Sequence, residues 1–323
     1  MSYLMLIAGF AILASAGDFL VRGSVLLADR LGIPPLIIGL TIVAFGTSAP
    51  ELFVSVRAVL HDAPGIAIGN VVGSNIANIF LVLGLPALIK VSECTDQGVG
   101  RNVVYMLGAS MLFVALCHYG PLAFWQGALL FGLLVLFLLD SARVALGNGN
   151  GPSEFEEEAN ELIGESGAAS RSLALTFLLI IVGVVGLPIG AHMTVSGASQ
   201  IAAALGISNA AIGLTAVALG TSLPELVTTI SCTLRGHGAM AIGNILGSNL
   251  FNILAVMGIT AMLAPVPVHD AILRIDLWVM LAAAIIIVPF ALGNLRLTRF
   301  PAALFVLAYI AYTIFVLAPK NGL

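Results

Sequence analysis

Apolar residues occur along this chain in long runs that short polar segments interrupt. A run of about 20 apolar residues is what an α-helix needs to cross the hydrocarbon core of a bilayer. Five runs lie near residues 3–21, 34–60, 64–89, 102–118 and 121–146, and five more lie near 172–191, 208–234, 238–264, 275–293 and 300–318. The pattern predicts an all-α polytopic membrane protein with ten transmembrane helices.

One long polar stretch divides the runs into two groups of five. Residues 1–146 would form a first five-helix repeat, 147–171 an acidic linker, and 172–323 a second five-helix repeat. The linker carries Glu154, Glu156, Glu157, Glu158, Glu161 and Glu165 among Gly, Ser and Asn residues. Such a composition is typical of a solvated, flexible linker. A regulatory cation-binding role for the same acidic run is the alternative.

The composition agrees with a membrane protein. Hydrophobic residues make up 60% of the chain and charged residues 9%, and the mean hydropathy is +1.12. These values lie far outside the range of soluble domains.

Three scattered cysteines, Cys94, Cys117 and Cys232, form no metal-ligand spacing and no disulfide framework. The first run has no basic leader or cleavage signature, so we expect a retained helix.

The two halves repeat one another at an offset of 174 residues. Residues 39–52 (GLTIVAFGTSAPEL) and 213–226 (GLTAVALGTSLPEL) share 11 of 14 positions, and 67–79 (AIGNVVGSNIANI) and 241–253 (AIGNILGSNLFNI) share 9 of 13. Because each half has an odd number of spans, the second half must enter the membrane from the opposite side. The sequence therefore predicts two inverted repeats that share a centre.

The placement of Lys and Arg predicts the orientation. With both termini outside, nine basic residues face the cytoplasm and three face outside, which agrees with the positive-inside rule. The nine are Arg22, Arg30, Lys90, Arg101, Arg143, Arg171, Arg235, Arg296 and Arg299, and the three are Arg57, Arg274 and Lys320. The acidic linker would then be cytoplasmic.

Each duplicated box places a glutamate inside an apolar segment. Glu51 follows Pro50 and Glu225 follows Pro224. A carboxylate at membrane depth is costly and usually marks an ion pathway. The proline has no N–H and leaves the carbonyl four residues earlier without its helical partner, so the helix is expected to break beside the acid.

Hydroxyl and amide side chains accompany the two acids at helical spacing. Thr47 and Ser48 share a face with Glu51, and Ser74 and Asn78 stand four residues apart. The second half repeats this set. All of these donors are hard oxygens without thiolate or imidazole, which favours Ca²⁺ or Na⁺ over Zn²⁺ or Cu²⁺, and Mg²⁺ fits less well. Two carboxylates balance one divalent or two monovalent cations.

The GTSAPE and GTSLPE boxes with their GNxxGSNxxN partners resemble the repeats of the calcium/cation antiporter superfamily, and most of all its sodium/calcium exchanger branch as found in bacteria. The resemblance implies a fold of ten helices and no enzymatic activity or cofactor. It implies cation coordination by side chains of Thr47, Ser48, Glu51, Ser74, Asn78, Thr221, Ser222, Glu225, Ser248 and Asn252, and by the carbonyls of Ala44 and Ala218. The bacterial inner (cytoplasmic) membrane is the expected location.

The expected function is a secondary antiporter that exchanges Ca²⁺ for Na⁺ by alternating access. Some exchangers of this superfamily carry an aspartate where this chain has Asn252, so an H⁺/Ca²⁺ antiporter that uses the same glutamates stays open. A cation channel is a more distant alternative. No HExxH, GxSxG or GxxxxGK[ST] motif occurs, which disfavours an enzyme and a primary pump. We expect the protein to be embedded in the lipid bilayer and to bind no nucleic acid or nucleotide.

Asp18 and His192 also occupy equivalent positions at the 174-residue offset. A proton-sensitive pair of these two residues is conceivable from the sequence. We favour an acid near a helix end and an ordinary histidine, and we leave both outside the predicted site.

Overall fold

The structure is a computed structural model. It describes residues 1–91, 98–147, 172–205, 220–293 and 295–317. Across these ranges the regular structure is helical, and an isolated antiparallel β-bridge joins Leu122 and Val266. Eight helices within them are long and apolar enough to span a membrane, or nine if one bent pair counts as a span. The chain is therefore a polytopic helical membrane protein.

The helices follow the predicted runs in order. In the first half they are α1 (Ser2–Leu31), α2 (Pro35–Ile38), η1 (Gly39–Val43), α3 (Ala44–Thr47), α4 (Ala49–Leu60), α5 (Pro64–Ala77), η2 (Asn78–Val82), α6 (Gly84–Ile89), α7 (Val99–Tyr119) and α8 (Phe124–Gly147). In the second half they are α10 (Leu173–Ala204), α12 (Leu223–Leu234), α13 (Gly238–Phe251), η4 (Asn252–Met257), α14 (Gly258–Leu263), η5 (Ile272–Asp276), α15 (Leu277–Ile286), α16 (Val288–Leu292) and α17 (Arg299–Leu317). The segments labelled η are π-helical.

The predicted run 208–234 is described only from residue 220 onward, where α12 forms, and its first part lies outside the described residues. Nearly all of the predicted linker, residues 148–171, also lies outside them. The total of ten spans and the inversion of the two halves therefore stay predictions. The other nine runs correspond to helices or to broken helices.

The opening helix of each half extends beyond its apolar run. The two runs end near residues 21 and 191, whereas α1 continues to Leu31 and α10 to Ala204. The polar residues Asp18 and Arg22 ended the apolar pattern, but they form an ion pair one helical turn apart and do not interrupt the helix.

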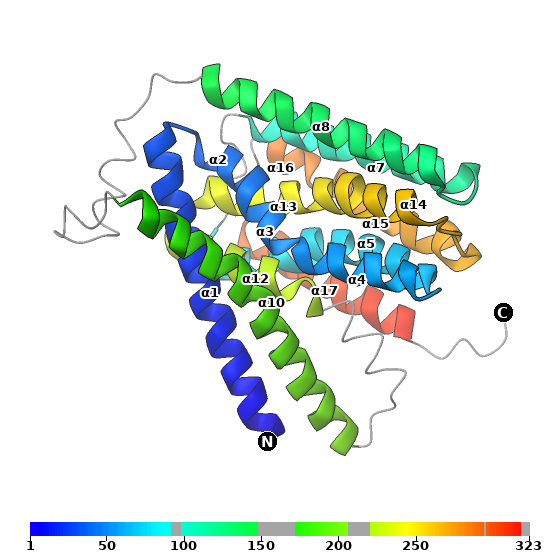
Figure 1. Ribbon diagram of the computed structural model, residues 1–323, viewed down its shortest axis with the longest axis horizontal. Helices are drawn as coiled ribbons and strands as arrows, with labels where there is room; N and C mark the ends of the chain where they lie inside the picture. Colours follow the sequence, from blue (N-terminus) through cyan, green and yellow to red (C-terminus); the bar gives the residue numbers. More distant parts are fainter. Residues whose placement is uncertain (92–97, 148–171, 206–219, 294, 318–323) are drawn as a thin grey trace.

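Figure 1 shows α1 and α10 side by side, crossing the rest of the molecule obliquely. The two helices are antiparallel, since Gly9 lies against Thr194 and Leu20 lies against Gly183. A Cβ added to Gly190 would lie 2.8 Å from the Leu13 nitrogen and 3.0 Å from the Gly9 carbonyl oxygen. Glycine thus permits a backbone approach that any other residue would prevent.

α13 is the most enclosed helix of the described structure, with every residue from Met240 to Phe251 buried. It packs against the broken helix of the first half through glycines. A Cβ on Gly243 would lie 2.4 Å from the Leu36 carbonyl oxygen, and one on Gly247 would lie 2.5 Å from that of Leu40. The glycines of this box therefore pack helices closely, as small residues often do in membrane bundles.

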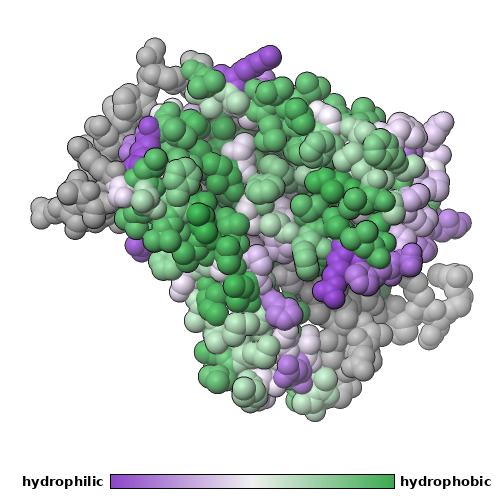
Figure 2. Space-filling model, in the orientation of Figure 1, coloured by the Kyte–Doolittle hydropathy of each residue, from purple (hydrophilic) through white to green (hydrophobic). Residues whose placement is uncertain are grey.

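Apolar side chains cover broad areas of the outer surface (Figure 2), and many large hydrophobic side chains are exposed. A surface of this kind suits contact with lipid.

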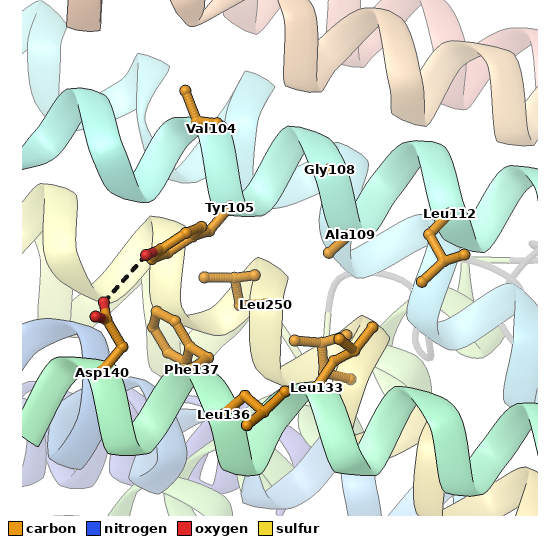
Figure 3. A pocket seen from close by; sticks show the side chains of 11 residues that line it. Val104, Tyr105, Gly108, Ala109, Leu112, Leu133, Leu136, Phe137, Asp140 and Leu250 are labelled. Atoms are coloured by element: carbon orange, nitrogen blue, oxygen red, sulfur yellow. Dashed lines mark hydrogen bonds between the residues drawn. The ribbon is translucent and has the colours of Figure 1, made fainter.

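The outer helices α7 and α8 are joined where the Tyr105 hydroxyl donates a hydrogen bond of 3.1 Å to Asp140 (Figure 3). Arg101 lies 3.5 Å from the same carboxylate. An apolar cavity of about 400 Å³ lies between the two helices.

Candidate cation site

The predicted helix break lies beside Glu51. α3 ends at Thr47, Ser48 leaves the helical conformation, and α4 begins at Ala49 with a bend of 42° between the two segments. Glu51 is in the first turn of α4 and is 0% exposed. In the second half α12 begins at Leu223 with Glu225 in its first turn, also 0% exposed. Both acids therefore lie inside the bundle at a helix start, where the helix dipole favours negative charge.

The second pair of boxes supplies the facing walls. Ser74 is on α5 and Ser248 on α13, and both are fully buried. Asn78 and Asn252 are also fully buried, and each is the first residue of a π-helical segment, η2 or η4. Short π-helical segments inside α-helices are frequent at functional sites.

Hydrogen bonds between the halves bring the predicted residues together. The hydroxyls of Thr47 and Ser248 are 3.3 Å apart, and so are those of Ser74 and Thr221, the equivalent pair at offset 174. The Ser48 hydroxyl donates to a Glu225 oxygen at 3.2 Å. Thr47 before α4 and Thr221 before α12 thus each meet the glycine-rich helix of the other half, so the centre is built from both halves.

Several buried oxygens at this centre lack a hydrogen-bond partner among the described residues. They include both carboxylate oxygens of Glu51, one of Glu225, the Ser222 hydroxyl and the side-chain oxygens of Asn78 and Asn252. A buried polar group without a partner is costly. Buried oxygens without a partner are groups that could bind a cation.

The structure describes only one of the two predicted carbonyl ligands, that of Ala44. The Ala44 carbonyl accepts hydrogen bonds from the Ser48 N–H at 2.9 Å and from the Thr47 hydroxyl at 3.3 Å. Ala218 lies outside the described residues. No cluster of three His, Cys, Asp or Glu side chains suited to a metal occurs within the described ranges, so a cation here would depend on the two acids together with hydroxyls and amides.

A cavity of about 850 Å³ reaches this centre from one face of the bundle. Its lining includes Pro50, which precedes Glu51, and the predicted site residue Thr221, together with Arg57, His61 and His192. The cavity lies mainly between α4 and α10. It therefore extends from this face of the bundle to a residue of the candidate site.

A family model described as sodium/calcium exchanger protein matches residues 1–141 and 175–318. The chain belongs to the sodium/calcium exchanger family. The resemblance stated from the duplicated boxes is thereby confirmed.

Individual proteins are similar to this member of the sodium/calcium exchanger family over most of the chain. The inner membrane protein YrbG of Escherichia coli is 38% identical over 285 residues, which is 87% of this chain and 86% of that protein. The sodium/calcium exchanger MaX1 of Methanosarcina acetivorans is 31% identical and covers 97% of both chains. A solved structure of the sodium-calcium exchanger NCX_Mj matches with a TM-score of 0.81 at 30% identity, covering 99% of this chain and 98% of that one.

Asn70 and Asn244 belong to this candidate site, although the sequence analysis did not single them out. The Asn70 amide nitrogen donates to the Glu51 carbonyl at 3.2 Å and to Ser55 at 3.0 Å, and its oxygen accepts from Thr221 at 3.1 Å. Asn244 makes the equivalent bonds to Glu225, Thr229 and Thr47 at 3.5, 3.1 and 3.2 Å. Their duplication inside the GNxxGSN boxes was the available signal.

Asn249 has a related supporting role. Its side-chain oxygen accepts a hydrogen bond of 3.1 Å from the Asn78 amide nitrogen, and its own nitrogen lies 3.5 Å from the Met106 sulfur. This contact fixes the Asn78 amide so that its oxygen, rather than its nitrogen, is left without a partner. An oxygen is the end of an amide that can bind a cation.

Proposed function

We propose that this chain is a secondary active antiporter that exchanges Ca²⁺ for Na⁺ by alternating access to one central site. The observation that supports this most directly is the pair of fully buried glutamates, Glu51 and Glu225, among unpartnered oxygens from both halves. The names of the relatives MaX1 and NCX_Mj, both sodium/calcium exchangers, support the choice of ions.

The charges of the site set what it can hold. Two ionised glutamates carry two negative charges, which one Ca²⁺ or two Na⁺ would balance. Because buried charge is tolerable only when it is compensated, binding of either ion type would exclude the other. Competition of this kind for one site is the physical basis of exchange. Asn78 and Asn252 are neutral, so a third Na⁺ would leave excess positive charge.

The proposed ligands are the twelve residues that the sequence analysis assigned. Thr47, Ser48, Ser74, Thr221, Ser222 and Ser248 would contribute hydroxyls, Asn78 and Asn252 amide oxygens, Glu51 and Glu225 carboxylates, and Ala44 and Ala218 carbonyls. Their hard oxygens suit Ca²⁺ and Na⁺. These two ions would be substrates rather than resident cofactors.

We further propose ten spans in two inverted repeats, with both termini outside and the acidic linker in the cytoplasm. The antiparallel packing of α1 against α10, the first helix of each half, supports the inversion. In this orientation Arg57 and His61 lie near the outer surface, so the cavity that they line would open to the outside. The conformation described here would then be outward-facing.

An H⁺/Ca²⁺ antiporter is the second candidate. Glu51 and Glu225 have buried oxygens without partners, and such carboxylates could take up protons when Ca²⁺ leaves. The two candidates use the same site and differ only in the coupling ion.

Measurement of ⁴⁵Ca²⁺ uptake into proteoliposomes tests the proposal. The wild-type protein would be compared under an imposed Na⁺ gradient and under an imposed pH gradient, with Glu51→Gln as the blank. We expect uptake driven by the Na⁺ gradient and none in Glu51→Gln, because the amide keeps the shape of the side chain and removes its charge. Uptake driven only by the pH gradient would replace Na⁺ with H⁺. Gradient-independent leak would indicate a channel, and full exchange in Glu51→Gln would refute the site.

A further inference from the structure

The contact between α1 and α12 and the equivalent contact between α10 and α4 differ: the first is closed and the second is open. α1 packs against α12, where a Cβ on Gly17 would lie 3.0 Å from a Val227 methyl group. The residues at offset 174 from these two are Ala191 on α10 and Phe53 on α4, and both line the cavity. The contact that is closed between α1 and α12 thus corresponds to an open space between α10 and α4.

An ion pair connects the closed contact. The Arg235 guanidinium, just after the end of α12, donates from Nε to an Asp18 oxygen at 2.7 Å and also from its terminal nitrogen. Arg22 binds the other Asp18 oxygen at 2.8 Å. The side chains of Asp18 and Arg235 are only 25% and 21% exposed. Charged hydrogen bonds are stronger than neutral ones, and partial burial limits screening by solvent.

The open side carries different chemistry at the equivalent positions. Asp18 corresponds to His192 and Arg235 to His61, and both histidines line the cavity. Neither can supply a carboxylate, so these two residues cannot form an ion pair if α10 approaches α4. Arg57, in the last turn of α4, also lines the cavity and adds a positive charge there.

We propose that Asp18 and Arg235 are positioning residues that hold α1 against α12 and so favour the conformation in which the cavity between α4 and α10 is open. The proposal rests on the alternating access put forward above. If α1 and α10 move relative to the other helices, opening of the α1–α12 contact would break the ion pair. Closing of the α4–α10 cavity would form no replacement from His61 and His192. The two access states would then differ in free energy through this one pair.

Thiol labelling at equivalent positions tests this without any transport measurement. In a background with Cys94, Cys117 and Cys232 replaced by alanine, Val54→Cys would report on the cavity and Thr228→Cys on the equivalent α12 position. The protein would be labelled in detergent, where a water-soluble maleimide reaches both faces. We expect faster labelling at Val54→Cys, and we expect Arg235→Gln to reduce the ratio of the two rates about tenfold, which corresponds to about 1.4 kcal/mol.

Two further variants separate the ion pair from a general loss of structure. Arg22→Gln removes the partner of Asp18 that stays on α1 in either state, so it should leave the ratio unchanged. Arg235→Lys keeps the charge and should retain most of the wild-type ratio. An unchanged ratio in Arg235→Gln, or an equal shift in Arg22→Gln, would overturn the proposal. Failure of ⁴⁵Ca²⁺ exchange in the wild-type protein would instead refute the proposed function, whatever the labelling rates.

Discussion

Replacement of Asn244 by leucine would test whether the two halves are joined through this side chain. Leucine has a similar volume and cannot form hydrogen bonds. It would remove the three bonds that Asn244 makes to Thr47, Thr229 and the Glu225 carbonyl. Thr47 belongs to the broken helix of the first half and Asn244 to α13 of the second, so the change removes one of the contacts that join the halves at the proposed site.

The expected cost follows from these bonds. A hydrogen bond contributes about 0.5–1.5 kcal/mol net, so the loss of three corresponds to roughly 2–4 kcal/mol. Asn102→Leu is the matched control. Asn102 is also fully buried, but its amide donates one bond of 2.8 Å to Gly98 within the first turn of α7. The expected cost of the control is therefore about 1 kcal/mol.

Thermal unfolding in detergent, with and without Ca²⁺, provides the assay. A ligand that binds only the folded state raises the unfolding temperature, so the rise produced by Ca²⁺ reports on affinity. We expect Asn244→Leu to lower the unfolding temperature more than Asn102→Leu does and to weaken the Ca²⁺-induced rise, because Thr47 loses its hydrogen bond to Asn244. Equal losses in the two variants, together with an unchanged Ca²⁺ effect, would refute this reasoning.

Two other predictions concern packing and pH. Gly190→Ala places a Cβ within 2.8 Å of α1 backbone and should destabilise the protein by about 1–3 kcal/mol, whereas Gly132→Ala, with no heavy atom within 4 Å of its Cβ, should be neutral or stabilising in thermal unfolding. His237, between α12 and α13, is buried near Arg235 and Lys90, and burial first and these charges second lower its pKa below the ordinary 6.5. The unfolded chain then binds more protons, so stability should fall as the pH decreases below about 6.5, and His237→Gln should reduce that fall in unfolding measured from pH 7.5 to 5. If the stability of His237→Gln fell with decreasing pH as much as that of the wild-type protein, this role of His237 would be contradicted.

The sequence was sufficient for the broad architecture. Hydropathy indicated a helical membrane protein, and the duplicated boxes indicated two related halves and the exchanger family. It also placed Glu51 at a helix break, because Pro50 cannot donate the hydrogen bond that a continuous helix needs. These features depend on residues that are close together in the chain, and they could be derived without knowledge of long-range contacts.

Other features could not be derived locally. The first apolar run ends near residue 21, whereas α1 continues to Leu31 through the Asp18–Arg22 pair. Asp18 lies well inside that helix rather than near its end, and it binds Arg235, not His192. Two residues 217 positions apart can be assigned as partners only once helix packing is known.

The tertiary structure alone also decides how the duplicated residues differ. The Ser48 hydroxyl donates to Glu225, whereas the hydroxyl of the equivalent residue Ser222 has no hydrogen-bond partner among the described residues. Repetition at a fixed offset determines that Glu51 and Glu225 have the same chemical type and the same local helix position. It does not determine their hydrogen bonds, because those depend on how one half packs against the other in a particular conformation.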